Sequence, residues 1–422
     1  MNVNNERGNQ ATRYLTDEMP GIGGRIKEKP ADFAVEELPL YSPSGEGGHT
    51  FFEIRKVGLS TFQAVRAMAQ ALDVPAGRIS YAGLKDARAV TCQVLSVEGI
   101  PPEVVMATEV PHIQIKWAER HNNKLRIGHL RGNRFTIRIR GVDESLVDRC
   151  QAILEVLQRR GVPNSYGPQR FGQRGDSHLL GREVVRRDAR AFVQRFLGGP
   201  HPNETAIVRE ARAAFEAGRW QEARALFPHG MNDERRALQT LIQSGGDYRR
   251  TLAAVPRRLR TFFVSAYQSS LFNRVLDARL ETLDWVYVGD LAMKHPGRSV
   301  FYVEDAEAEQ PRAERFEISP TGPLYGHKMI QARGRQGELE AAVLAAEDMT
   351  LASFRVGEGI KAEGERRALR FPVNEPEMWY DEGIMLRFSL PRGCYATTLL
   401  AEIMKVSLLP EGEDGEAETD VT

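Results

Sequence analysis

The chain has 422 residues, of which 41% are hydrophobic and 27% are charged, and its 57 basic residues balance 57 acidic ones. This length allows two or three domains, and the composition is that of a globular protein with a large core. The sequence has no run of 18 apolar residues, no apolar leader, no CxxC pair among its three cysteines and no HExxH, Walker A or GxGxxG motif. It therefore predicts no membrane span, no disulfide scaffold and no metal or nucleotide site of those kinds.

The cysteine pattern suits a reducing compartment, so we expect a cytoplasmic protein. The zero net charge hides two opposite segments. Residues 115–140 carry eight bases and one acid, whereas the tail 411–422 carries six acids and no base. The basic stretch is either a solvated face or a surface that contacts phosphates. The tail should be disordered, because its like charges repel one another.

Residues 1–24 are expected to be disordered or loosely docked, and regular patterns begin at Arg25. An N-cap at Ser60 or Thr61 predicts a helix whose apolar stripe follows it. Alternating hydrophobicity predicts strands on both sides of that helix. The strands are "HTFFEIRKVG" from His49, a short piece at 79–82, 91–99 and 134–142, and an amphipathic helix is expected at 144–160. The stripe of the first helix is Phe62, Val65, Met68, Ala69 and Leu72. This mixture of strands and helices is typical of an α+β domain.

The middle of the chain has a different composition. Residues 202–227 and 258–280 are rich in Ala, Arg, Glu and Leu at helical spacing. The segment "SPTGPLYG" at 319–326 is dense in turn residues and predicts a loop. A strand at 385–390 and a short helix at 397–404 follow.

One loop places a charged pair between two apolar stretches. In "SYAGLKDARAVTCQ", residues 80–93, Lys85 precedes Asp86, and Gly83 allows the backbone to bend. Taken alone, such a pair is most often solvated and worth little. The alternative is that the turn projects one carboxylate toward a substrate.

This loop is one of six segments that resemble, in order, the signatures of the tRNA pseudouridine-13 synthases, the TruD family. The others are "KLRIGHLRGNRFTIRIR", "VPNSYGPQRFGQRGDSHLLGREVV", "AYQSSLFN", "SPTGPLYG" and "LPRGCYATTLLAEIM", and together they extend from about Arg25 to Met404. The resemblance implies a pseudouridine synthase core of mixed, mainly antiparallel sheet and helices. It also implies an inserted α/β domain special to the family. We expect the core at 25–164 and 373–408, the insertion at 165–372 and the disordered tail at 409–422.

The resemblance implies that the protein isomerises uridine to pseudouridine in tRNA, at position 13. Such enzymes detach uracil from C1′ of the ribose and rejoin it through C5. They need no metal, cofactor or cosubstrate. We expect tRNA as the partner, no membrane and a monomer. Two alternatives remain open: an RNA-binding protein with an inactive synthase fold, and a glycosidase that releases the base.

By resemblance, Asp86 is the catalytic carboxylate and nucleophile. A cation beside it would keep it ionised despite burial. Lys85 is adjacent in sequence, but neighbours in an extended segment point apart. Lys27, in "IKEKPADF", resembles a family lysine and is the expected ion-pair partner.

The flipped target base needs aromatic walls and hydrogen bonds to its edge. By resemblance, Phe33 and Asn133 contact the nucleotide, and Tyr395 stands where the family pattern has Phe. Phe135 lies on the apolar face of its strand, where a place in the core and a place in the pocket wall are both open. The insertion is expected to grip tRNA, with Arg170 and Arg174 among its contacts.

Overall fold

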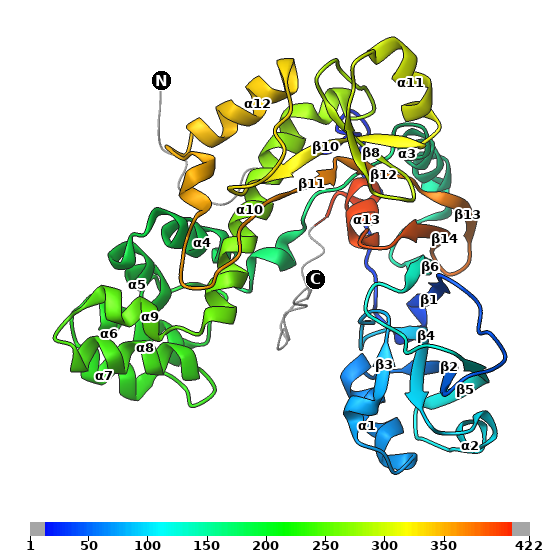
Figure 1. Ribbon diagram of the computed structural model, residues 1–422, viewed down its shortest axis with the longest axis horizontal. Helices are drawn as coiled ribbons and strands as arrows, with labels where there is room; N and C mark the ends of the chain where they lie inside the picture. Colours follow the sequence, from blue (N-terminus) through cyan, green and yellow to red (C-terminus); the bar gives the residue numbers. More distant parts are fainter. Residues whose placement is uncertain (1–12, 407–422) are drawn as a thin grey trace. The chain divides into compact units, whose positions relative to one another are not determined.

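The computed structural model describes residues 13–406 and divides the chain into two compact units (Figure 1). We call Leu15–Val162 with Phe371–Leu408 the sheet unit, and Pro163–Arg370 the helical unit. The sheet unit is thus built from two separate stretches of chain, and the helical unit is the stretch between them. The acidic tail, for which disorder is expected, lies outside the described residues.

An eight-stranded sheet forms the centre of the sheet unit. Its strand order is β13-β14-β6-β1-β4-β2-β5, and β3 pairs with β4 at the side of this path. Only β1 and β4 run parallel among these pairs. The strands are β1 (Phe33–Pro39), β2 (His49–Val57), β3 (Ile79–Tyr81), β4 (Val90–Glu98), β5 (Ile113–His121), β6 (Leu130–Ile139), β13 (Asn374–Tyr380) and β14 (Ile384–Pro391).

Helices cover the sheet where its strands carry apolar side chains. The helices α3 and α13 share one buried cluster with β1, β6 and β14, and α1 shares another with β2 and β4. The helices of this unit are α1 (Thr61–Ala71), α2 (Pro102–Met106), α3 (Val147–Arg160) and α13 (Ala396–Met404), with short 3₁₀ turns η1 (Pro30–Asp32), η2 (Ala76–Arg78) and η3 (Glu144–Leu146).

The helix α1 begins as its sequence predicts. Ser60 is the N-cap, and its side chain and that of Gln63 bond reciprocally to each other's backbone N–H. The predicted apolar stripe is buried except at Phe62, which is 45% exposed. The prediction was wrong there because Phe62 lies in the first turn of α1, where its ring packs edge-on against the half-buried Tyr81 of β3 and stays partly open to solvent.

The segment before Arg25 is anchored to α13. The backbone N–H groups of Leu15 and Thr16 donate to the buried carboxylate of Glu402. Ile22 donates its N–H to the carbonyl of Ile403 at 3.0 Å and is itself buried. Residues 15–24 are therefore well anchored, and the expectation of a disordered or loosely docked segment fails for them.

The helical unit combines a run of helices with a small antiparallel sheet. The helices pack around α10, which contributes several residues to the largest buried cluster. They are α4 (Ser177–Arg186), α5 (Ala189–Leu197), α6 (Ala206–Glu216), α7 (Trp220–Leu226), α8 (Asn232–Gln243), α9 (Tyr248–Ala254), α10 (Arg257–Arg279), α11 (Ala306–Glu314) and α12 (Gly334–Ala345), with η4 (Pro168–Phe171), η5 (Leu280–Thr282) and η6 (Leu351–Phe354). The sheet has the order β11-β10-β8-β9, from β8 (Leu291–Lys294), β9 (Val300–Tyr302), β10 (Ile318–Leu324) and β11 (Glu365–Ala368), and a separate pair joins β7 (Val162–Pro163) to β12 (Arg370–Phe371).

The predicted loop "SPTGPLYG" is instead a central strand, β10. It pairs with β8 over Ile318–Pro320 and with β11 over Thr321–Leu324. Since each half is paired on one side, a proline lacking an N–H can be accommodated. A Cβ on Gly322 would lie 2.9 Å from Leu369 and 3.0 Å from Phe272, so the glycine permits close packing rather than a turn.

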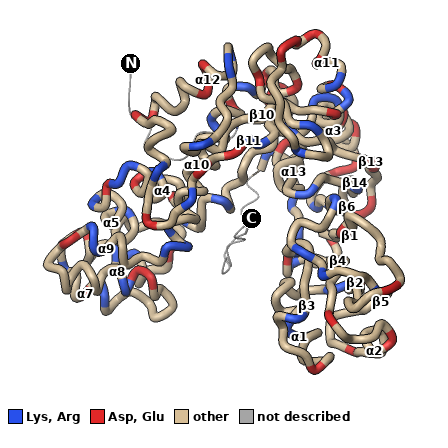
Figure 2. The backbone as a smooth tube through the Cα atoms, in the orientation of Figure 1, with Lys and Arg blue, Asp and Glu red and all other residues tan. Residues whose placement is uncertain are grey.

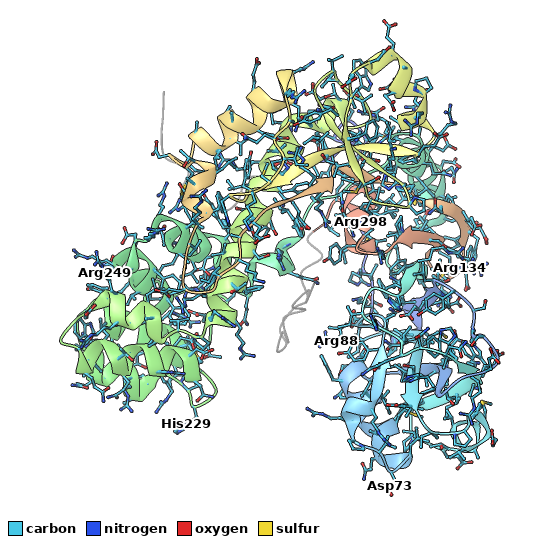
Figure 3. All side chains as sticks on the ribbon, in the orientation of Figure 1. Asp73, Arg88, Arg134, His229, Arg249 and Arg298 are labelled. Carbon is cyan, nitrogen blue, oxygen red and sulfur yellow. The ribbon has the colours of Figure 1, made fainter. Side chains whose placement is uncertain are left out.

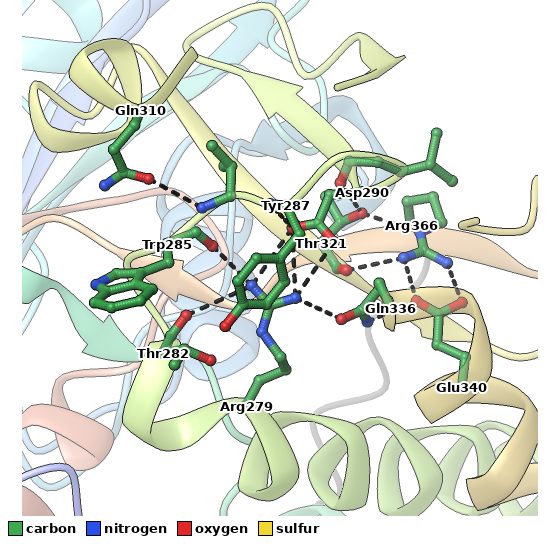
Figure 4. A network of polar contacts seen from close by, with 12 residues as sticks. Arg279, Thr282, Trp285, Tyr287, Asp290, Gln310, Thr321, Gln336, Glu340 and Arg366 are labelled. Carbon is green, nitrogen blue, oxygen red and sulfur yellow. Dashed lines mark hydrogen bonds and ion pairs between the residues drawn. The ribbon is translucent and has the colours of Figure 1, made fainter. Parts of the chain in front are cut away.

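A network of buried polar side chains holds this strand in the helical unit (Figure 4). Arg366 makes two hydrogen bonds to the carboxylate of Glu340, at 2.7 and 2.8 Å, and a third to the carbonyl of Thr321. Arg279 donates to Gln336 at 2.6 Å and faces Asp290 at 3.3 Å. Each carboxylate is buried and paired, which is the arrangement that makes a buried charge tolerable.

Candidate active site

Residues 82–89 form the loop between β3 and β4, and hydrogen bonds from neighbouring elements hold this loop in place. Gln93 of β4 donates its side-chain amide to the carbonyl of Gly83 at 2.7 Å. Thr61, the first residue of α1, accepts the backbone N–H of Lys85 at 2.8 Å. Lys56 of β2, which is completely buried, donates to the carbonyl of Asp86 at 3.2 Å and to that of Leu59. The loop is therefore fixed by three neighbouring elements.

The two charged residues of the loop point to different surroundings. Lys85 turns inward, and its ammonium bonds Glu37 Oε2 at 2.7 Å, with only 4% and 1% of the two side chains exposed. Asp86 turns outward, and its side chain is 36% exposed. The inward lysine supports the turn, and the outward carboxylate is the one that a substrate can reach.

Asp86 is held as an anion. Lys27 forms an ion pair with its Oδ2, and the backbone N–H of Arg88 donates to its Oδ1 at 2.8 Å. Burial alone would raise the pKa of this carboxyl, but Lys27, the Arg88 hydrogen bond and the charge of Lys56 together hold the pKa below its usual value. Burial lowers the pKa of Lys56 to about 8, although Asp86 opposes this change.

Lys27 reaches the carboxylate from an unusual backbone conformation. Its φ is 61°, in the left-handed region that residues with a side chain rarely adopt. Two residues earlier the backbone is tied to β6, because Arg25 and Arg140 exchange hydrogen bonds at 2.8 and 2.9 Å. The ammonium also lies 4.5 Å from the centre of the Phe33 ring. Strained residues of this type cluster at functional sites.

A row of aromatic rings continues from Lys27 into the core. Phe33 meets Phe135 edge to face at 6.2 Å, and Phe135 stacks on Phe388 at 5.5 Å. Phe33 is 5% and Phe135 is 7% exposed. In the sheet, Phe135 lies between Val35 and Phe388, in a row that continues through Thr91 and Lys56 to β5. Phe135 therefore belongs to the core, and only the edge of its ring could contact a substrate.

Two buried oxygens on the same face of the sheet have no hydrogen-bond partner among the described residues. They are Asn133 Oδ1 and Thr91 Oγ1. Asn133 pairs with Glu37 of β1 and with Leu390 of β14 in the sheet register. Since buried polar atoms are nearly always satisfied, these two are candidates to bind a ligand or an ordered water.

Within residues 13–406, no group of three or more His, Cys, Asp and Glu side chains could hold a metal ion. No helix in that range is long and apolar enough to cross a membrane. The site is thus a single ionised carboxylate at the rim of an aromatic and amide-bearing surface. A carboxylate of this kind can attack, stabilise or deprotonate an electron-poor carbon.

Comparison with known proteins places the chain in a family. The profile of tRNA pseudouridine synthase D (TruD) matches residues 10–403. The chain belongs to the TruD family. It is 49% identical to the tRNA pseudouridine synthase D of Geobacter metallireducens, over 93% of this chain and 98% of the relative. It is 47% identical to that of Geobacter sulfurreducens, over 94% and 98%. A crystal structure described as a putative TruD from Methanosarcina mazei superposes with a TM-score of 0.85 at 29% identity, covering 94% of this chain and 97% of that one.

Membership of the TruD family and the α+β fold are therefore confirmed. The structure brings Lys27, Asp86, Phe33 and Phe135 into one continuous set of contacts, with Asn133 on the same face of the sheet. Tyr395 is the N-cap residue of α13 and is half-buried, and Arg392 of the same turn donates to the carbonyl of Gly128 at 2.6 Å. Sequence reasoning missed Lys56, Glu37 and Thr91. The only feature of the sequence that could have indicated these three residues is that each is polar at a strand position expected to face inward.

The basic stretch at 115–140 divides in the structure. Arg134, Arg138 and Arg140 on β6 pair with acids, notably Arg140 with Asp32 at 2.7 Å. Figure 3 labels Arg134 and, in the loop at 82–89, the exposed Arg88. Lys124, Arg126 and Arg131, in or beside the connection between β5 and β6, are exposed and form no ion pair with another described residue. These three residues and the exposed Lys116 of β5 are the part of the stretch that is available to phosphates.

The two arginines expected to grip RNA are engaged inside the helical unit. Arg170 donates to Ser265 and Ser269 and lies near the ring of Tyr166. Arg174 pairs with Asp176 at 2.9 Å and is 15% exposed. Both arginines are half-buried, and their guanidinium groups bond hydroxyl and carboxylate groups of the same unit. Lys and Arg residues are distributed along the helices of this unit (Figure 2), and exposed pairs include those at 249–250 and 257–258.

Proposed function

We propose that this protein converts uridine to pseudouridine in tRNA, at position 13, with Asp86 as its catalytic carboxylate and Lys27 as the ion-pair partner. One observation carries the proposal. Two carboxylates lie at the loop. Glu37 is buried in an ion pair with Lys85, whereas Asp86 is ionised, hydrogen-bonded and 36% exposed. An RNA-binding protein needs no such group, and membership of the TruD family supplies the reaction.

The chemistry follows from the position of that carboxylate. Asp86 attacks C1′ as the bond to N1 of uracil breaks, so the electron pair of that bond leaves with the base. The base turns, C5 bonds to C1′, the carboxylate is released, and the C5 proton is lost to a base as N1 gains one. A path through a glycal uses the same ionised oxygen to take a proton from the sugar. In both cases the RNA keeps its mass.

Asp86 is also the proton acceptor that the geometry favours for C5. Phe135 stands on the strand face beside the site and cannot carry a proton. Lys56 has a lowered pKa, but it is completely buried and donates to two carbonyls, so it acts as a positioning residue. The carboxylate that leaves C1′ regains its charge in time to accept the proton.

The flipped base would lie against aromatic and amide groups of the sheet unit. Phe33, whose ring is beside Lys27, supplies an apolar wall, and the edge of Phe135 continues it. Asn133 has an unpartnered amide oxygen that can accept the imide N–H of uracil. Tyr395 would close the pocket from the start of α13, with a hydroxyl where the family pattern has none.

The helical unit, as the family's insertion, would grip tRNA by its shape and backbone. Its exposed arginine pairs at 249–250 and 257–258 are suited to phosphates. We take the enzyme to be a cytoplasmic monomer that uses no cofactor.

The direct test is to incubate unmodified tRNA with the purified protein, digest the RNA and locate pseudouridine by mass spectrometry after chemical labelling. Pseudouridine at position 13 is expected, with no change in the mass of the tRNA. An abasic site would instead identify a glycosidase. Intact uridine after tight binding would identify a binding protein.

A further inference from the structure

A second cavity lies in the sheet unit, behind the loop that carries Asp86. Its volume is about 130 Å³. Glu37 lines it and also bonds Lys85, the residue before Asp86. The proposed reaction uses none of the aromatic residues around it.

The walls of this cavity combine rings with polar edges. Tyr41, Phe51, Trp117 and His129 line it, and the hydroxyl of Tyr41 bonds His129 Nδ1 at 2.7 Å. That bond leaves Nε2 of the imidazole available to a ligand. Pro39 and Ser42 also line the cavity and are exposed, so it reaches the surface.

The size of the cavity limits what it can hold. A cavity of about 150 Å³ is known to accept one benzene molecule. The space here is close to that of one six-membered ring, which admits a pyrimidine with its edge toward the opening and excludes a purine. Aromatic walls with hydrogen-bonding edges are the usual surroundings of an unstacked base.

Charge around the cavity favours a nucleic acid over an apolar side chain. Leu125 and His129 reach it from the connection between β5 and β6. The same connection carries Lys124 and Arg126, and Arg131 follows at the start of β6; all three are exposed and unpaired among the described residues. Burial raises the pKa of Tyr41, and the charge of Arg126 partly opposes it, so this cation is close to the ring. A base in the cavity would bring its phosphates to these residues.

We propose that this cavity binds a second, unstacked pyrimidine of the tRNA substrate, distinct from the target uridine. Holding that nucleotide would fix the strand beside the target and select for sequence near it. The inference rests on the proposed function, because its ligand is part of the same RNA.

The test measures the Kd of the full-length protein for a set of tRNA transcripts. Each transcript lacks the base of one unpaired nucleotide near the target. One abasic position should weaken binding about tenfold, as expected for the loss of one base stacked on aromatic residues. A purine placed at that position should weaken binding equally.

Two variants connect this loss to the cavity. Trp117→Ala removes a wall, and Ser42→Phe fills the exposed rim without disturbing the core. Each variant should bind intact tRNA about tenfold more weakly than the unchanged protein does. Its Kd should not rise further when the tRNA lacks the base that fills the cavity, because the two changes remove the same contact. Ser44→Phe, on the same exposed loop but outside the cavity, is the matched control and should behave as the unchanged protein.

The proposal is overturned if both variants bind intact tRNA as tightly as the unchanged protein. It is also overturned if each abasic transcript weakens the binding of Ser42→Phe as much as that of the unchanged protein. The cavity would then be only a gap in the packing of the sheet unit. Because binding is the readout, these outcomes are independent of whether pseudouridine forms. Absence of pseudouridine with the unchanged protein would instead contradict the proposed function.

Discussion

The Asp86 loop of the sheet unit and the Arg366 network of the helical unit both place carboxylates among buried cations, but they do so differently. Asp290 is 1% and Glu340 is 4% exposed, and their oxygens face the arginines of the same network. Asp86 is 36% exposed, and unpartnered oxygens of Asn133 and Thr91 lie on the same sheet as the strands that hold its loop. Burial of charge is common to both, so it does not mark a site. A candidate site is marked by an ionised group that its neighbours hold in place and that a substrate can reach.

Asp86→Asn should have the largest effect, because it removes the charge and keeps the shape. Pseudouridine formation should be abolished, while the Kd for tRNA stays within about tenfold, since phosphate contacts supply most of the affinity. Asp86→Glu should be nearly inactive as well, because a shift of about 1 Å in a reacting atom can cost roughly 10²-fold. Digestion of tRNA after long incubation, with Kd measured in parallel, checks both variants. A variant that loses affinity and activity together would instead place Asp86 in binding.

Lys27→Met should lower kcat by roughly 10²-fold by removing the partner that orients the carboxylate. Only the Arg88 hydrogen bond and the charge of Lys56 would then oppose burial, so the pKa of Asp86 should rise. In the unchanged protein that pKa is held low, so the rate should be independent of pH between about 5 and 7. The variant should lose activity as the pH falls through that range. A flat pH–rate profile in the variant would show that Lys27 does not control the ionisation of Asp86.

Lys56→Met should lower kcat by about tenfold and leave KM for tRNA unchanged, because Lys56 holds the carbonyl of Asp86 and touches no substrate. Its pKa is about 8 in the folded protein, below that of a free lysine near 10.4. Between these values the unfolded chain binds more protons, so Lys56 makes the free energy of unfolding rise with pH. Denaturant unfolding from pH 7 to 10 should show this rise in the unchanged protein and a smaller one in the variant. A rise in KM with kcat unchanged would contradict a positioning role, because it would show that Lys56 contributes to tRNA binding.

Replacing Arg249 and Arg250 by Ala should raise KM for tRNA by about threefold to tenfold, with kcat unchanged, and reduce the salt dependence of binding. Both are exposed on α9, and Arg249 is labelled in Figure 3. Arg315→Ala is the matched control, because that exposed arginine pairs with Glu317 at 2.7 Å, more closely than Arg250 pairs with Asp247 at 3.6 Å. Equal effects from the two would indicate a general influence of charge rather than a tRNA contact.

Glu340→Gln should have the smallest effect on catalysis and a clear effect on stability. It leaves Arg366 buried without its anion, which costs about 3 kcal/mol or more. The melting temperature should fall by several degrees. Activity for each folded molecule should be unchanged, and a specific loss of kcat would break the distinction between the two clusters.

The sequence predicted the parts of this structure that depend on local pattern. The strands β2, β4 and β6 follow from their sequence patterns, and the cap of α1 is Ser60, one of the two predicted N-cap residues. The strand β10 could not be predicted, because its prolines and glycine suit a turn until β8, β11 and Phe272 are in place around them. The anchoring of residues 15–24 depends on Glu402, almost four hundred residues away in the chain.

The site was predictable in part for the same reason. Asp86 and Lys27 were found through resemblance, and the outward turn of Asp86 relative to Lys85 through strand geometry. The residues that support the Asp86 loop could not be predicted from the sequence. Lys56 and Glu37 are charged residues at inward strand positions, and their partners come from other parts of the chain. Arg170 and Arg174, which were expected to contact RNA, have partners within the helical unit, and the sequence does not reveal which arginines the fold itself uses.

The most direct measurement is single-turnover tritium release from tRNA that carries 5-tritiated uridine, with Asp86→Asn and Glu340→Gln compared at equal concentrations of folded protein. Release of the C5 hydrogen accompanies the formation of the new bond to C1′. The Asn variant should release no tritium while binding the tRNA, and the Gln variant should release it at the rate of the unchanged protein. Release by Asp86→Asn near the unchanged rate would contradict the assignment of the reachable carboxylate as the catalytic group.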